Sequence, residues 1–194
     1  MGRYYKRVRS AGGVTAASAT DITLDIPGSK YGELAILAFW VTASESATAD
    51  KLYFMKSLAT TTMKGAMASG VSTVTLAALP ALGSNAIASG DLLAIQMDDD
   101  TYHFTLLSGT STTSVWAIGT ALDDTVASGN AVYWLGLYSD TGHFKYQLTA
   151  STQSTKELAS GLFYSGGKGY PMRVFHDNAG SVPGRIDLVT WAYV

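Results

Sequence analysis

The sequence of 194 residues predicts an all-β protein: a jelly-roll-like β-sandwich built from both ends of the chain, with a second β lobe inserted between them. Short apolar segments with the alternation of strands are separated by Gly, Pro and Asn turn signals about every 8–12 residues. No helical segments regularly separate these strands, as a parallel α/β fold would require. The last segment, Ile186 to Val194, is apolar and alternating, which is typical of a terminus tied into a sheet.

The first part of the chain contains two predicted strands and one ambiguous segment. Ile22 to Ile26 alternates apolar and polar residues and stops at Pro27-Gly28, as a strand that ends in a turn does. Leu34 to Val41 is an unbroken apolar run, typical of a strand buried on both faces and too short to span a membrane. Ala49 to Met63 is the one helical candidate, because some of its apolar residues lie three positions apart.

The middle of the chain contains an internal repeat. Ala88-Ser89-Gly90-Asp91 precedes an apolar strand and then Asp100-Thr101-Tyr102-His103-Phe104. Ala127-Ser128-Gly129-Asn130 precedes another apolar strand and then Asp140-Thr141-Gly142-His143-Phe144, with offsets of 39 residues between the glycines and 40 between the histidines. Glycine supplies a positive φ, and Asp or Asn can bond its own backbone, so Gly90-Asp91 and Gly129-Asn130 are predicted to form equivalent turns. We expect two equivalent units that share one core.

These signals predict three regions. Residues 1–19 are expected to form an N-terminal arm, residues 20–64 and 151–194 the β-sandwich, and residues 65–150 the inserted lobe with its two repeat units. Within the inserted lobe, Val115 to Ile118 is a further strand after a Ser-Gly turn. Near the C-terminus, Tyr170 to Phe175 and Ile186 to Val194 are alternating strands separated by turn residues.

The composition excludes several functions. The chain has 13 basic and 15 acidic residues and a net charge of −2, which is not the strongly basic balance of a general nucleic-acid binder. It has no cysteine, which excludes disulfides, thiolate metal ligands and a cysteine nucleophile. Only 14% of its residues are charged, and a surface so poor in charge is weakly protected against association. We therefore expect a homo-oligomer.

The histidines and the acidic clusters do not form a recognisable metal motif. His103, His143 and His176 lack the spacing of a zinc site, and the first two occupy equivalent repeat positions. Asp98 to Asp100 and Asp123-Asp124 are clusters of a kind that can bind Ca²⁺, but His103 stands where an EF-hand loop starting at Asp98 needs glycine. Both clusters fall at predicted turns, which Asp favours. We predict turn roles for them, and neither a metal site nor a cofactor.

Two further segments suggest catalysis or phosphate binding but lack the required pattern. Ser165 to Gly169 contains Gly-Gly-Lys, without the spacing, the hydroxyl residue after lysine or the following helix of a phosphate-binding loop. His176-Asp177 could belong to a hydrolytic triad, yet no serine lies in a Gly-x-Ser-x-Gly elbow. We therefore predict a non-enzymatic protein with no catalytic residues.

The N-terminal segment is the candidate partner-binding site. Four positive charges precede the first acidic residue, Asp21, and Arg and Tyr are enriched at interfaces. One interpretation is an arm that becomes ordered only when it is bound to a partner, because its single aliphatic residue, Val8, cannot offset the entropy cost of ordering. The other is a solvated tail. The candidate residues are Arg3, Tyr4, Tyr5, Lys6, Arg7 and Arg9.

Part of the inserted lobe resembles the small β modules of tailed-bacteriophage virion proteins. The similar segments are Val74-Thr75-Leu76, Ala88 to Ile95 and Asp100-Thr101-Tyr102-His103, and the weakly charged, cysteine-free composition is similar as well. Within that group the chain most resembles capsid decoration, or cement, proteins. The resemblance implies a structural protein on the capsid surface of a virion, with the major capsid protein as its partner and a trimer as its favoured state. It implies no direct contact with nucleic acid or membrane.

The alternative is a phage tail, fibre or baseplate module that binds host-surface glycans. Trp116, Tyr133, Trp134 and Tyr138 could stack on sugars, although aromatic residues along strands more often belong to a core. A glycan-binding module should expose several of them in one groove, whereas a cement protein should bury them.

Overall fold

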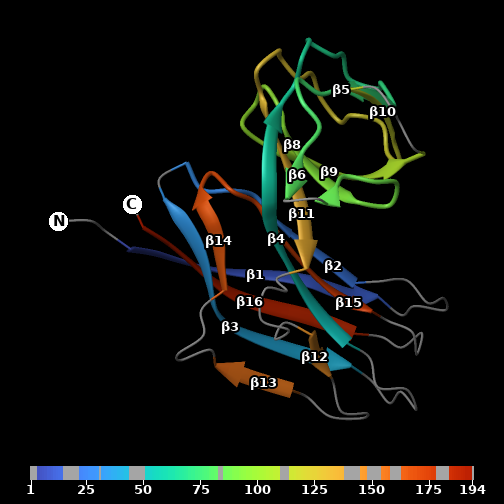
Figure 1. Ribbon diagram of the computed structural model, residues 1–194. Helices are drawn as coiled ribbons and strands as arrows, with labels where there is room; N and C mark the ends of the chain where they lie inside the picture. Colours follow the sequence, from blue (N-terminus) through green and yellow to red (C-terminus); the bar gives the residue numbers. More distant parts are fainter. Residues whose placement is uncertain are drawn as a thin grey trace. The chain divides into compact units, whose positions relative to one another are not determined.

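The computed structural model describes residues 4–14, 22–30, 32–43, 51–82, 85–109, 114–137, 145–147, 154–157, 163–177 and 184–193. Within these ranges the chain is all-β, and no helix that could cross a membrane is found among them. The chain divides into two compact units, one formed by Met1–Lys56 with Leu137–Val194 and the other by Ser57–Gly136. We call them the sandwich unit and the inserted unit (Figure 1).

The sandwich unit contains two antiparallel sheets. One sheet has the order β1-β16-β3-β13, and β14 also pairs with β3, next to β13 along that strand. The other has the order β2-β15-β4, with β12 on β4. The strands of the first sheet are β1 (Tyr4–Val14), β3 (Glu33–Ala43), β13 (Ser154–Glu157), β14 (Phe163–Lys168) and β16 (Gly184–Tyr193). Those of the second are β2 (Ile22–Ile26), β4 (Lys51–Thr62), β12 (Lys145–Gln147) and β15 (Met172–Asp177).

This strand order is that of a jelly roll. Successive strands alternate between the sheets at both ends of the chain, and the C-terminal strands insert between the N-terminal ones: β16 lies between β1 and β3, and β15 between β2 and β4. Such double sheets of Greek-key connectivity are found in viral capsid proteins, lectins and cupins. The prediction of an all-β, jelly-roll-like sandwich built from both chain ends is therefore confirmed.

The core of the sandwich follows the alternation of its strands. Each of the strands β2, β3, β4, β15 and β16 contributes two apolar side chains, spaced two residues apart, to one buried cluster. Leu34, Ala35 and Ile36 are buried in succession, as predicted for the unbroken apolar run in β3. The cluster consists of Leu24, Ile26, Leu34, Ile36, Leu52, Phe54, Met172, Val174, Ile186 and Leu188.

Two predictions for this unit are wrong. The helical candidate Ala49 to Met63 contains the strand β4 instead. Its alternate residues Leu52 and Phe54 are buried in the core, so the period of two decides the structure and the spacing of three is incidental. The N-terminal segment is also not an unpaired arm, because Tyr4–Val14 pairs with β16. The partner strand supplies the backbone hydrogen bonds that stabilise it, which the local sequence could not show. Arg3 lies outside the described residues.

The inserted unit is a closed barrel. Its strands follow the order β4-β11-β8-β9-β10-β5, and the residues just after β5 pair with those at and just after the end of β4, which closes the barrel. At this closure Met63 pairs with Leu76, and the amide of Lys64 donates to the carbonyl oxygen of Thr75 over 2.8 Å. The further strands are β5 (Thr73–Thr75), β8 (Leu92–Gln96), β9 (Tyr102–Ser108), β10 (Val115–Ile118) and β11 (Ala131–Leu137), and β6 (Ala81–Leu82) and β7 (Asn85–Ala86) form a separate small hairpin.

The barrel encloses its own apolar core. Inward side chains alternate with outward ones, so that Leu93 and Ile95 of β8 and Val132 and Trp134 of β11 share one cluster. These strands each follow one of the repeat turns. The full cluster is Met63, Val74, Leu76, Ile87, Leu93, Ile95, Met97, Leu107, Trp116, Ile118, Leu122, Val126, Val132 and Trp134.

Candidate functional site in the inserted unit

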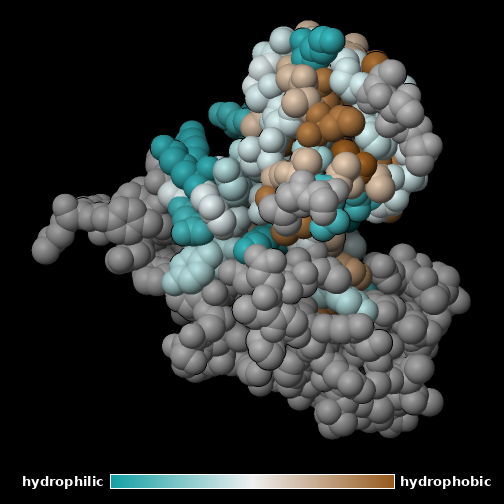
Figure 2. All heavy atoms as spheres, viewed as in Figure 1, coloured by the Kyte–Doolittle hydropathy of each residue, from teal (hydrophilic) through white to brown (hydrophobic). Residues whose placement is uncertain are grey.

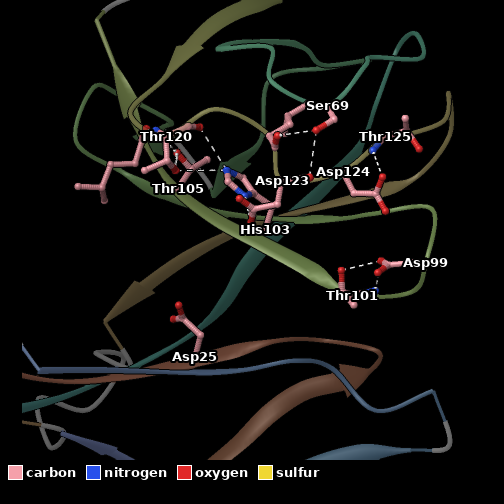
Figure 3. A network of polar contacts seen from close by, with 12 residues as sticks. Asp25, Ser69, Asp99, Thr101, His103, Thr105, Thr120, Asp123, Asp124 and Thr125 are labelled. Carbon is pink, nitrogen blue, oxygen red and sulfur yellow. Dashed lines mark hydrogen bonds and ion pairs between the residues drawn. The ribbon is translucent and has the colours of Figure 1, made fainter.

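A polar network lies at one end of the barrel (Figure 3). His103, on β9, is 3% exposed, and its Nδ1 lies 2.7 Å from Oδ2 of Asp123. Its Nε2 lies 3.2 Å from the carbonyl oxygen and 3.2 Å from the hydroxyl of Thr120. The Thr120 amide and hydroxyl both donate to Oγ1 of Thr105, at 3.1 Å and 3.0 Å. Both ring nitrogens of the buried histidine are therefore engaged, which fastens the segment that holds Thr120 and Asp123 to β9.

The acidic turn after β8, Asp98 to Asp100, is also held by hydrogen bonds to its carboxylates. Oδ1 of Asp98 accepts hydrogen bonds from the amide of Ala127 at 2.7 Å and from Nδ2 of Asn130 at 2.9 Å. Oδ1 of Asp99 accepts from the amide and the hydroxyl of Thr101. Hydrogen bonding from Thr125 lowers the pKa of Asp98, and hydrogen bonding from Thr101 lowers the pKa of Asp99.

These contacts give the predicted acidic clusters a structural role. Asp98 ties its own turn to the turn at Ala127, and Asp123 accepts from His103 in the network. Among the residues that the structure describes, no group of three or more His, Asp or Glu side chains is placed to hold a metal ion. His176 is fully buried in β15, opposite Ile22 and Leu52 in the ladders, and His143 lies outside the described ranges.

The two repeat turns have the same geometry. Gly90 has a φ of +89° and Gly129 a φ of +92°. In each turn the residue after the glycine donates its amide to the alanine three positions earlier: Asp91 to Ala88 and Asn130 to Ala127. The strands that follow, β8 and β11, pair with each other. Most of the second copy's tip, from 138 to 144, lies outside the described residues.

A third turn with a positive-φ glycine after Ala-Ser, at Gly70, was missed in the sequence. Gly70 has a φ of +83° and follows Ala68-Ser69, the same triplet that begins both repeat turns. Its amide donates to the carbonyl oxygen of Leu122, and the hydroxyl of Ser69 donates to the carbonyl oxygen of Asp123. The repeated Ala-Ser-Gly triplet was the signal that could have found it.

The segment that superficially resembles a phosphate loop is the end of β14 and the start of its connection to β15 in the other sheet. Gly166, within β14, has a φ of +93°, and Gly169, just after β14, has a φ of +79°. The amide of Gly166 donates to Oε1 of Glu33, so a carboxylate of the chain itself takes a position where an anion could bind. The fully buried hydroxyl of Ser165 accepts from the amide of Leu34. These contacts fasten the end of β14 to the start of β3.

The aromatic residues considered for glycan binding are mainly core residues. Trp116, Tyr133 and Trp134 are 3%, 6% and 7% exposed, and both tryptophans belong to the barrel core. Tyr138 lies outside the described residues. Tyr102 and Phe104 were not among these glycan-binding candidates. They are half-buried neighbours on the outward face of β9, with ring centroids 6.5 Å apart.

The candidate arm residues fall on an edge strand. Tyr4, Tyr5, Lys6, Arg7 and Arg9 all lie in β1, with Arg7 opposite Thr190 and Arg9 opposite Leu188 of β16. The backbone positions of these residues are thus fixed by the sheet. Their binding to a partner stays a prediction.

No protein-family model matches the sequence, and no curated protein matches it. Among solved structures, it is similar to the VP16-VP17 complex of the two major capsid proteins of bacteriophage P23-77, with 9% identity, full coverage of both chains and a TM-score of 0.24. VP17, a capsid protein of that phage, has 10% identity over 99% of this chain and 97% of its own, with a TM-score of 0.25. The VP2 subviral particle of infectious bursal disease virus has 10% identity over 100% of this chain and 42% of its own, with a TM-score of 0.18. Scores this low do not establish a common fold, and we draw no functional conclusion from them.

Proposed function

We propose that the chain is a non-enzymatic structural protein of a bacteriophage particle, and more specifically a capsid decoration protein. It binds the major capsid protein on the outer surface of the shell and bridges neighbouring subunits. The observation that carries this proposal is the jelly-roll order of the sandwich unit, an architecture frequent in viral capsid proteins. One fold supports many functions, so the side chains that the fold brings together must decide among them.

The interiors of both units favour a structural role. The sandwich core cluster consists of apolar side chains, and the polar groups of the barrel network bond one another. Catalysis needs polar groups that converge on a place where a substrate can bind. The buried His103 instead faces Asp123 and Thr120 of its own unit. These contacts therefore stabilise the fold of the inserted unit and do not serve a reaction.

The alternative, a tail, fibre or baseplate module that binds host glycans, is less well supported. It required exposed aromatic side chains in one groove, and Trp116, Tyr133 and Trp134 are buried. A decoration protein needs no such groove. It acts through specific contacts of about 1,200–2,000 Å² each, which are repeated over the shell.

We further propose that the protein acts as a homotrimer and that β1 takes part in binding the capsid. The low content of charged residues favours association, and closed cyclic symmetry satisfies it without open filaments. Arg7 and Arg9 place two positive charges on an edge strand, and carboxylates of a partner are the groups that would pair with them. Because deletion of residues 1–9 would remove much of β1, substitution of Arg7 and Arg9 by glutamine is the better test of this contact.

A binding comparison tests the main proposal. The purified full-length chain is mixed separately with emptied phage capsids and with intact host cells, and bound protein is measured after sedimentation. We expect saturable binding to capsids and none to cells. The paired substitution of Arg7 and Arg9 by glutamine should lower capsid occupancy, and high salt should lower it for the wild type. Binding to cells without binding to capsids would refute the decoration role and support the glycan-binding alternative.

A further inference from the structure

The charges of the chain are divided unequally between its two units. Ser57–Gly136 contains one lysine, Lys64, and six aspartates, which give the inserted unit a net charge of −5. The remaining residues contain 12 basic and 9 acidic side chains, which give the sandwich unit a net charge of +3. A chain whose overall charge is close to zero therefore has one acidic and one basic unit, and each attracts the opposite unit of another copy.

The inserted unit also has an apolar outer face. On β9, the inward residues His103, Thr105 and Leu107 are buried, so Tyr102, Phe104 and Leu106 face outward. Leu106 is 50% exposed, and Val115, on the outer face of the adjacent strand β10, is 47% exposed. The outward residues of β9 form a continuous apolar stripe, and Val115 lies four positions along β10 from the residue opposite Leu106. Such a stripe on the outside of the barrel indicates a contact surface that uses side chains.

This outer face adjoins acidic residues at one end. Asp99 and Asp100 are exposed and immediately precede β9, which begins at Tyr102. Asp123 and Asp124 lie near the same end, because Asp123 bonds to His103 of β9. Figure 2 shows apolar residues of the inserted unit reaching the molecular surface, with hydrophilic residues beside them. An apolar face with an acidic end is complementary to a basic surface that also exposes apolar groups.

We propose that the outer face of β9 and β10, with its acidic end, binds the sandwich unit of a second copy of this chain. The inference rests on the proposed structural function, in which many copies assemble. The argument for a second copy is charge complementarity, since the chain itself contains the basic unit that the acidic unit would bind. Because the two surfaces differ, the contact is head-to-tail, and three such contacts can close the ring of the proposed trimer.

Sedimentation velocity of the full-length protein at micromolar concentrations tests the proposal, in physiological salt and in 1 M salt. We expect a concentration-dependent oligomer that weakens in 1 M salt, where screening shortens from about 8 Å to about 3 Å. Leu106→Lys should raise the dissociation constant at least about tenfold, which is about 1.4 kcal/mol. Asp100→Asn should raise it about two- to fivefold in physiological salt and have a smaller effect in 1 M salt.

Two matched variants serve as controls. Leu79→Lys adds the same charge to another exposed leucine of this unit, which is 41% exposed and lies outside the proposed face. Asp91→Asn removes the same charge at the opposite end of β8 from Asp100, where the Asp91 carbonyl oxygen accepts from the amide of Leu107 on β9. Leu79→Lys should leave association unchanged, and Asp91→Asn should weaken it less than Asp100→Asn does. Asn tolerates a positive φ, so Asp100→Asn is compatible with the φ of +65° at that residue. Circular dichroism spectra that match the wild type verify that all four variants are folded, since the melting temperature itself depends on association.

Three results would overturn the proposal: a monomer at all concentrations, an oligomer that neither Leu106→Lys nor Asp100→Asn weakens, or one that both controls weaken equally. Capsid binding is measured separately. A wild-type chain that self-associates but does not bind capsids would overturn the proposed function and leave this interface standing. A chain that binds capsids as a monomer would overturn this interface and the proposed trimer, and leave the decoration role standing.

Discussion

Replacing Gly129 by alanine isolates the cost of a left-handed backbone position. Gly129 has a φ of +92°, which side-chain-bearing residues rarely adopt, and a Cβ built there meets no atom within 4 Å. The substitution therefore introduces backbone strain without a clash, and we expect it to destabilise the protein by about 1–2 kcal/mol. For a chain of this size that corresponds to a fall in melting temperature of about 2–4 °C per kcal/mol.

Urea denaturation of matched variants measures this effect. Gly90→Ala should cost a similar amount, because Gly90 has a φ of +89° and the same open surroundings. Gly65→Ala is the control, since a Cβ there also meets no atom within 4 Å and the residue has no positive φ. It should be neutral, or stabilising by about 0.4–1 kcal/mol through the unfolded state. Equal midpoints for Gly129→Ala and Gly65→Ala would refute the strain assigned to this turn, and clearly different costs for Gly129→Ala and Gly90→Ala would refute the equivalence of the two turns.

Three further predictions concern the close approach of Gly28 to Gly169, the acidic turn and the barrel core. Gly28→Ala should destabilise the sandwich unit severely, because its Cβ would overlap the carbonyl oxygen of Gly169; protein recovered with a wild-type melting temperature would contradict this close approach. The folded-state pKa of Asp98 is lowered, so its stabilising effect is present above the unfolded pKa, near 3.9, and is lost as the pH falls through the lower folded value. Asp98→Asn should accordingly flatten the pH dependence of the unfolding midpoint below about pH 4, and an unchanged pH profile would count against the turn contact. Trp116→Phe should cost much less than Trp116→Ala, because the buried Nε1–H of Trp116 has no hydrogen-bond partner in the described part of the chain and phenylalanine keeps most of the apolar volume, whereas Trp116→Ala should cost about 3–5 kcal/mol in a thermal melt.

Much of the fold could be predicted because alternation and turn chemistry are local. Ile22 to Ile26 and Val115 to Ile118 form strands with the predicted bounds, and Gly90 and Gly129 have the positive φ that their turn signals required. The predictions that failed concern segments whose structure depends on distant parts of the chain. β1 is stabilised by β16, at the other end of the chain, so its own basic sequence indicated only an arm. The β4 segment had helical spacing by coincidence, and its burial between partner strands decided the outcome.

The polar network could be predicted only in part. The turn roles of Asp98 and Asp123 followed from the preference of aspartate for turns. The pairing of His103 with Asp123 did not, because it depends on how residues 20 positions apart meet at the end of a barrel whose closure the sequence did not reveal. The same holds for the bond from Gly166 to Glu33, which joins residues 133 positions apart.

The strand order also constrains when each unit can form during synthesis. The barrel uses Ser57–Gly136 and its contacts are comparatively local, so all of its strands are available once that stretch has left the ribosome. The sandwich cannot be completed then, because β15 and β16 occupy central positions in its two sheets. Until they emerge, β1 lacks its partner, and β2 and β4 lack the strand between them. The N-terminal strands thus pass through a period with unpaired edges, in which chaperone binding or mispairing with another nascent chain competes with folding.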